Sequence, residues 1–285
     1  MNYNDPIKFQ QERDFGQVFN AIFSFIKQDF RKLSSIFIRY CGPLIILTVI
    51  ASTLYQYRFL GVELNPYSSN PLDIFEGMWG IIVLMVILSA ATQTMIAATI
   101  YSYISLYATK GPEGFEAEDV WKKVTENFFK LLGTTIVCGI IIGIGTVFCI
   151  IPGIYLGVSL CFILFIIVHE EKSFGDAFSR SFELSHERWW WTLLLIIVIF
   201  MIIGVISFVF TLPATIMTAT SEFHNTNPGN FSENSKIILS VFNVLSSLIS
   251  HVLNVVPLVA FSFQYFAIVE SKDKTSLMNQ IDQIN

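Results

Sequence analysis

Five long stretches of this 285-residue chain contain no Asp, Glu, Lys or Arg, and this feature constrains its fold more than any other. The stretches are residues 40–57, 77–109, 131–168, 189–221 and 237–269. About 20 apolar residues in a helix cross the hydrocarbon core of a bilayer, so each stretch is long enough for at least one crossing. Only 14% of all residues are charged while 53% are apolar, which is far from the composition of a soluble domain. The sequence therefore predicts an all-α integral membrane protein.

The positions of the basic residues predict how the chain is oriented. All but two of the 17 Lys and Arg lie before residue 40, between 110 and 130, between 172 and 188, or after 271. The exceptions are Arg58 and Lys236. Because loops rich in Lys and Arg stay in the cytoplasm, the four basic clusters mark the cytoplasmic face, and an even number of crossings must separate each cluster from the next. We expect both termini to be cytoplasmic and the protein to lie in a bacterial inner membrane.

The same parity divides the central stretch, residues 131–168, which has basic residues at both ends. It must enter the membrane and return, and the Pro152-Gly153 pair near its middle is the expected turn. Two full crossings are predicted, with a re-entrant hairpin as the alternative. The complete prediction is six transmembrane helices arranged as three hairpins.

An internal repeat groups these helices into three units. The segment FGQVFNAIFSFIKQDF at 15–30 matches FGDAFSRSFELSHERW at 174–189, and DVWKKVTENFF at 119–129 is a weaker third copy. Each copy precedes a hairpin and is predicted to form a cytoplasmic amphipathic helix. The predicted organisation is a polar tail at 1–14, a membrane domain at 15–270 with repeats at roughly 15–109, 115–170 and 173–270, and a polar tail at 271–285.

The first of these helices has one apolar face at helical spacing. That face consists of Phe15, Phe19, Ile22, Phe23, Ile26, Phe30 and Leu33. We expect it to pack on the ends of the spans. The alternative is a helix that lies in the headgroup plane of the membrane, with its basic residues near anionic lipid.

Polar residues inside the spans form a candidate lining. They are Gln93 on the second span and Asn243, Ser247, Ser250, His251 and Asn254 on the last. Four of those on the last span are separated by four, three and four residues, which places them on one helical face. Hydrogen bonding between helices is the favoured interpretation, and a polar lining for a small ligand or lipid headgroup is the alternative.

Residues with catalytic or metal-binding chemistry are few and scattered. The four histidines, His169, His186, His224 and His251, fall on two cytoplasmic connections, one outer connection and one span. No serine or cysteine nucleophile with a base and an orienting acid is evident. We therefore predict no catalytic residue, no metal site and no cofactor, and we expect no nucleic-acid partner. A histidine-ligated iron oxygenase acting on an apolar substrate is a disfavoured alternative.

The segment 152–190 resembles a large bacterial group of membrane proteins, which includes the membrane domain attached to some glycerophosphoryl diester phosphodiesterases. In that group a Pro-Gly turn leads a span that ends in an acidic residue, followed by an Arg-Ser-containing helix and a Trp-rich entry to the next span. The matching residues here are Pro152, Gly153, Glu170 or Glu171, Asp176, Ala177, Arg180, Ser181, Trp189 and Trp190. The resemblance implies a stand-alone membrane module of six spans, without the phosphodiesterase domain and without catalytic residues of its own.

Three functions are compatible with these observations. We favour a protein without catalytic activity that organises membrane lipids or other membrane proteins. An uncoupled permease or small-molecule channel is the second, because polar stripes could line a path. Coupled transport is disfavoured, since His251 is the one ionisable side chain deep in a predicted span. The oxygenase is the third.

Overall fold

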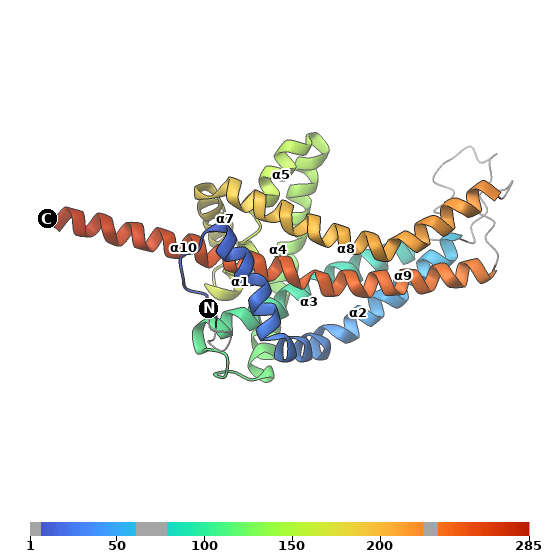
Figure 1. Cartoon of the computed structure of the whole chain (residues 1–285), viewed down its shortest axis with the longest axis horizontal. Helices are drawn as coiled ribbons and strands as arrows, with labels where there is room; N and C mark the ends of the chain where they lie inside the picture. The colour runs from blue at the N-terminus through green and yellow to red at the C-terminus, as the bar shows by residue number, and fades with distance from the viewer. Residues whose placement is uncertain (1–6, 61–78, 225–232, 285) are drawn as a thin grey trace. The chain divides into compact units, whose positions relative to one another are not determined.

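The computed structural model describes residues 7–60, 79–224 and 233–284, and within these ranges the chain forms ten α-helices and no β-strand (Figure 1). The helices are α1 (Phe15–Gln28), α2 (Phe30–Leu60), α3 (Trp79–Lys110), α4 (Ala117–Phe148), α5 (Ile150–Ser159), α6 (Ile163–His169), α7 (Phe174–Glu187), α8 (Trp189–His224), α9 (Glu233–Leu253) and α10 (Val255–Ile284). The predicted all-α class is confirmed.

Six segments of the described chain are long and apolar enough to cross a membrane. They are Phe30–Gln56, Trp79–Lys110, Ala117–Phe148, Ile150–His169, Trp189–Ala219 and Ile237–Lys272. Large apolar side chains on them stay exposed, among them Val86 and Val205. Such surfaces suit contact with lipid tails, since a soluble protein rarely exposes so much contiguous apolar surface. The chain is a multi-pass membrane protein.

The chain divides into two compact units. Unit 1 comprises Met1–Cys41, Gln93–Phe200 and Val255–Asn285, and unit 2 comprises Gly42–Thr92 and Met201–Asn254. This division follows the distribution of charge. Arg58 and Lys236 belong to unit 2, and all other Lys and Arg of the sequence belong to unit 1.

The core of unit 1 is aromatic. Its largest fully buried side chains include Phe25 of α1, Tyr101 and Tyr103 of α3, Phe165 of α6 and Phe263 of α10. The rings meet edge to face, as in the 5.4 Å centroid contact between Tyr101 and Phe165. Such contacts stabilise the fold by more than the burial of their apolar area alone would. Aromatic packing therefore joins α1, α3, α6 and α10.

Part of the predicted polar tail belongs to this core. Phe9 is buried, and its ring packs on four aromatic side chains: Phe25, Tyr107, Phe263 and Phe266. Arg13 is also buried and folds back to donate a hydrogen bond to the Phe9 carbonyl oxygen at 3.0 Å. Burial lowers the pKa of its guanidinium. Phe9 and Arg13 thus attach this segment to the core, while residues 10–12 between them are exposed.

Unit 2 combines parts of α2, α3, α8 and α9. Thr48 on α2 and Thr92 on α3 share a hydrogen bond of 2.7 Å, and both side chains are buried. Ser246 on α9 donates to the Phe210 carbonyl oxygen of α8 at 3.3 Å, and these two helices run side by side (Figure 1). Hydroxyl contacts of this kind are common between membrane helices.

The central hairpin turns earlier than predicted. The chain reverses at Cys149, whose extended backbone separates α4 from α5. Pro152 and Gly153 lie inside the first turn of α5, where a proline is tolerated because no helical partner awaits its missing N–H. Gly153 packs against Thr146 of α4, and a Cβ atom there would lie 2.9 Å from the Thr146 Cα. Each arm of the hairpin is long and apolar enough to cross the membrane.

Two other predicted boundaries differ. The third repeat copy, 119–129, does not form a separate helix but begins the continuous helix α4. The last uncharged stretch is interrupted at Asn254, between α9 and α10. Pro257 accounts for this interruption, since it cannot donate to the carbonyl of Leu253 and its ring would clash there.

The packing face of α1 also differs from the predicted one. Its buried residues are Val18, Ala21, Ile22 and Phe25. Of these, Ile22 alone belongs to the predicted apolar face. The phenylalanine row of that face lies beside the packed surface, and Phe23 is 40% exposed.

Candidate functional site

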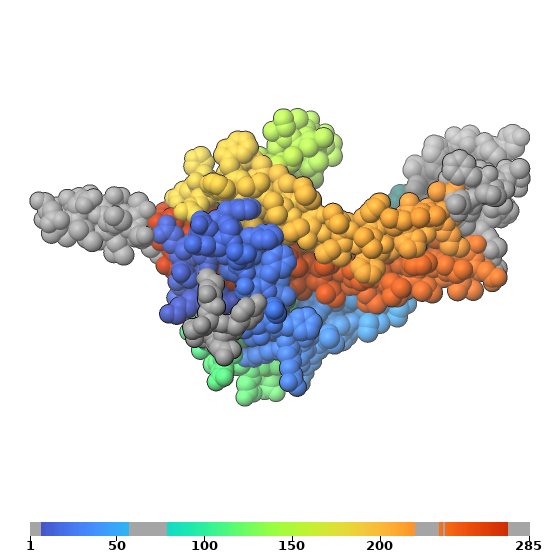
Figure 2. All heavy atoms as spheres, in the orientation of Figure 1, coloured from blue at the N-terminus to red at the C-terminus, as the bar shows by residue number. Residues whose placement is uncertain are grey.

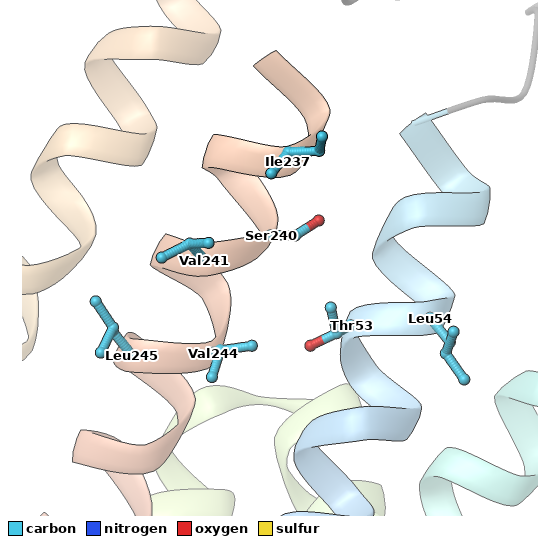
Figure 3. Close-up of a pocket in the computed structure, with 7 residues that line it drawn as sticks. All are labelled: Thr53, Leu54, Ile237, Ser240, Val241, Val244 and Leu245. Atoms are coloured by element: carbon cyan, nitrogen blue, oxygen red, sulfur yellow. The ribbon is translucent and has the colours of Figure 1, made fainter. Parts of the chain in front are cut away.

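An apolar groove in unit 2 is the first candidate site (Figure 3). It lies between α2 and α9, has a volume of about 500 Å³ and is lined by Thr53, Leu54, Ile237, Ser240, Val241, Val244 and Leu245. Thr53 points toward Ser240 and Val244 across the space. The Thr53 hydroxyl donates to the Val49 carbonyl oxygen at 2.8 Å, so its hydrogen bond stays within its own helix. The groove therefore presents an apolar surface.

The groove is open at its edges. Leu54 and Ile237 are 59% and 57% exposed, and no charged residue lines it. Both helices that form it contain candidate membrane spans. Its volume is within the range of about 300–1,000 Å³ that small-molecule sites have in proteins. The arrangement suits an apolar ligand.

The predicted polar lining is only partly brought together. Asn243, Ser247, Ser250 and His251 lie on α9, with Asn254 directly after it, all in unit 2. Gln93 is exposed and belongs to unit 1. Asn243, Ser247 and Asn254 are half-buried and His251 is buried. Ser250 is exposed, which differs from the expectation that this face points inward, and its hydroxyl donates to the Ser246 carbonyl oxygen at 2.8 Å.

Two polar atoms of this set are buried without a partner among the described residues. They are Asn243 Oδ1 and His251 Nδ1. An unsatisfied buried polar atom is costly and requires an explanation, such as water or a ligand. These atoms are the part of the predicted lining whose chemistry is not explained by contacts between helices.

The residues of the family-like motif lie in unit 1, where they fix helix ends. The backbone N–H of Asp176 donates the N-capping hydrogen bond of α7 to Ser173 Oγ at 3.4 Å. Ser181 donates to the Ser159 carbonyl oxygen at 2.7 Å, at the end of α5. Trp189 stacks on Tyr155, with ring centroids 5.8 Å apart. These contacts give the motif a structural role.

Glu170 and Arg180 of the motif meet in an ionic cluster. The carboxylate of Glu170 lies 3.7 Å from Arg180 Nε and 2.6 Å from Lys172 Nζ, and it accepts a 2.5 Å hydrogen bond from the Tyr265 hydroxyl. Glu171, the other acidic residue of the motif, has a side chain that is 77% exposed and a left-handed backbone with φ of 56°. The cluster at Glu170 joins the end of α6 to α7 and α10.

A second polar cluster escaped the sequence analysis. Ser105 of α3 lies with its Oγ 3.0 Å from His169 Nδ1, and Lys123 of α4 donates to the same oxygen at 3.1 Å. Lys123 Nζ is also 3.7 Å from the Glu171 carboxylate. Lys123 is 18 positions from Ser105 and His169 is 64 positions from it, so no local spacing could reveal this cluster.

A serine does meet a histidine and a lysine here, but among the described residues no acid that would orient the histidine is part of the contact. Ser105 is 1% exposed, however, and its hydroxyl cannot reach a substrate in this arrangement. The cluster connects α3, α4 and α6.

The described histidines are divided between the two units. His169 and His186 belong to unit 1 and His251 to unit 2, while the side chain of His224 lies outside the described residues. In the described part of the chain, no three His, Cys, Asp or Glu residues are grouped to hold a metal ion.

Comparison with known proteins places this architecture in a family. A family model described as "Domain of unknown function (DUF7847)" matches residues 120–269. Searches of curated proteins and of solved structures found no match. The matched region runs from α4 into α10 and includes the family-like motif, both polar clusters except Ser105, and the α9 side of the groove. Because the match covers more than half of the 285 residues, the chain belongs to the family of the DUF7847 domain.

Proposed function

We propose that this chain is a membrane protein without catalytic activity of its own that binds and organises membrane lipids. The observation that supports the proposal is the apolar groove between α2 and α9. We assign to it one acyl chain of a membrane lipid. Two of its walls are segments that can cross a bilayer, so the ligand that meets the groove most often is a lipid tail.

The physical basis of this binding is shape. A lipid tail gains little hydrophobic free energy on moving from the bilayer to a protein surface, because both are apolar. It gains dispersion contacts where a concave wall surrounds it on several sides. Binding is therefore selective for chain shape and reversible, which suits a protein that concentrates certain lipids around itself.

A filled groove provides the test. Val244 points into the groove, and Val244→Trp should occupy it. Ile238 lies on the same helix, is 45% exposed and does not line the groove, so Ile238→Trp is the matched control. With a phospholipid that carries a photoreactive acyl chain, we expect crosslinks to α2 and α9 in the wild type and the control, and their loss in Val244→Trp. Equal crosslinking of all three proteins would contradict the proposal.

An uncoupled permease is the second candidate, and the unpartnered Asn243 Oδ1 and His251 Nδ1 favour it. Buried polar atoms of this kind suit a hydrated path. In proteoliposomes this candidate requires solute flux above that of protein-free vesicles, lowered by Asn243→Leu with little loss of thermal stability. If Asn243 serves helix packing, the same substitution lowers stability and leaves flux unchanged.

For the location, we propose a bacterial inner membrane, with both termini in the cytoplasm and with lipids and other membrane proteins as partners. The charge distribution supports this orientation, since Arg58 and Lys236 alone fall in unit 2. Because six is an even number of spans, both ends of the chain would lie on the same side of the membrane.

A further inference from the structure

Helices α1 and α7 are fixed to the ends of membrane spans. Each has 14 residues. Asp29 alone separates α1 from α2, and Arg188 alone separates α7 from α8. Both α2 and α8 begin candidate spans at their first residue. Both 14-residue helices lie in unit 1, together with the start of α2 as far as Cys41 and the start of α8 as far as Phe200. A helix connected by one residue cannot move far from the membrane boundary.

The two helices use equivalent positions for packing. When Phe15 is aligned with Phe174, buried Val18 corresponds to buried Ala177, Ile22 to Ser181, and Phe25 to Leu184. The same side of each helix therefore contacts the rest of unit 1. Ser181 also anchors this side of α7 through its bond to the Ser159 carbonyl oxygen.

A row of three phenylalanines lies beside the packing side on each helix. The rows are Phe15, Phe19 and Phe23 on α1, and Phe174, Phe178 and Phe182 on α7. Their spacing of four residues brings neighbouring rings together, with centroids 5.0 Å apart for Phe19 and Phe23 and for Phe178 and Phe182. Phe23 and Phe174 are each 40% exposed, and the others are half-buried. Packing within unit 1 therefore leaves both rows partly uncovered.

The flank of each helix opposite its packing side is polar and exposed. Asn20 on α1 and Ser179 on α7 occupy equivalent positions there. Each helix thus has three flanks: one buried in the protein, one aromatic and one polar. A helix that lies at a membrane surface needs the last two, because the aromatic flank meets acyl chains and the polar flank meets water.

The aromatic row of α1 is continuous with the exposed aromatic residues at the start of α8. The Phe15 ring lies 6.0 Å from the ring of Trp191, and α1 lies beside the start of α8 (Figure 2). Trp190 and Trp191 are 76% and 55% exposed in the first turn of this span. Exposed tryptophans at a span end mark the interface between lipid and water. The α1 row therefore extends this surface, and on α7 the ring of Phe182 is linked to it through Tyr155 and Trp189.

We propose that the phenylalanine rows of α1 and α7 insert into the interfacial layer of the bilayer, as two wedges in one leaflet. The partner is the lipid bilayer that the spans cross. The exposed basic residues Lys27 and Arg31, near the end of α1, add attraction to anionic headgroups. This inference does not depend on the groove between α2 and α9.

Spin labels can test the insertion directly. The full chain, with Cys41, Cys138, Cys149 and Cys161 replaced, is reconstituted into bilayers that contain anionic phospholipid. Labels at Phe19 and Phe178 should be accessible to oxygen, which concentrates in lipid, and protected from a water-soluble nickel complex. Labels at the control positions Asn20 and Ser179 should show the reverse.

Two results would overturn the proposal. Water-like accessibility at Phe19 and Phe178 would show that the rows point into solvent, and low accessibility to both reagents would show that a protein surface covers them. Labels at Phe23 and Phe182 repeat the measurement if either first variant does not assemble. A lipid-like result at this second pair supports the proposal, and a water-like or protein-covered result overturns it.

Discussion

At the scale of single residues, Glu170 shows how this chain uses its few charges. Burial opposes ionisation of its carboxyl, but the hydrogen bonds from Lys172 and Tyr265 and the charges of Lys172 and Arg180 outweigh that effect. The pKa of Glu170 is therefore lowered from its ordinary value. A carboxylate with a lowered pKa stabilises the folded state above the pKa of the unfolded chain, and this contribution disappears as the pH falls through the lower, folded-state pKa.

Glu170→Gln should lower the stability of the purified protein by about 1–3 kcal/mol at about pH 7, because it removes hydrogen bonds to a charged group. The difference from wild type should shrink as the pH falls below 4.5, the ordinary value for this carboxyl. Thermal unfolding in mild detergent across that range is the measurement. The control is Glu171→Gln, whose exposed carboxylate lies 3.7 Å from Lys123 Nζ, and this substitution should matter little. A loss that does not vary with pH would argue against an ionic role.

At the scale of elements, the α4–α5 hairpin depends on a close approach of two helices. Gly145 and Gly153 face each other across it, and a Cβ on Gly145 would lie 3.5 Å from the Gly153 Cα. A Cβ on Gly153 would lie 2.9 Å from the Thr146 Cα, a backbone atom that cannot move aside alone. The spacing of these two helices is thus set by the absence of side chains.

Gly153→Ala should destabilise the protein by about 1–3 kcal/mol, the usual cost of excess volume in a packed interior. Gly157→Ala is the matched control on the same helix, since no atom lies within 4 Å of its Cβ position. It should be neutral or slightly stabilising, because alanine favours helix more than glycine does. The measurement is the melting temperature of each variant in the same detergent. Similar values for both variants would show that the close approach at Gly153 does not determine stability.

Sequence alone predicted the elements better than their junctions. An uncharged stretch is a local property, so the five stretches could be located without a structure, and the basic residues at both ends of 131–168 indicated that it crosses twice. Pro152-Gly153 was assigned to the turn because such pairs usually break helices, yet the first turn of a helix accepts proline and the reversal falls at Cys149. The groove and the contact between Ser105 and His169 join residues far apart in the chain, and neither leaves a periodic signal.

At the scale of the whole molecule, charge and contact clustering divide the chain in the same way. Arg58, near the end of α2, and Lys236, near the start of α9, belong to unit 2, and the four basic clusters belong to unit 1. The two divisions are independent, since one uses residue type and the other uses proximity. This agreement is the basis of the proposed orientation.

Single cysteines can check that orientation in a background free of native cysteines. In right-side-out inner-membrane vesicles, an impermeant maleimide added outside should label cysteines at Ser69 and Ser232, two positions outside the described residues. It should not label a cysteine at Glu113, which is exposed in the connection between α3 and α4. Labelling of Glu113→Cys alone would reverse the assignment of the two faces.

The burial of Phe9 has a consequence for the order in which the protein is made. Its ring rests on Phe25, Tyr107, Phe263 and Phe266, so its neighbours come from α1, α3 and α10. A ribosome produces Phe9 near the beginning and Phe263 near the end. During synthesis the N-terminal segment has half of its partners, and it can settle only when α10 has entered the membrane. Protection of this segment from protease should therefore appear only after α10 has been inserted into the membrane.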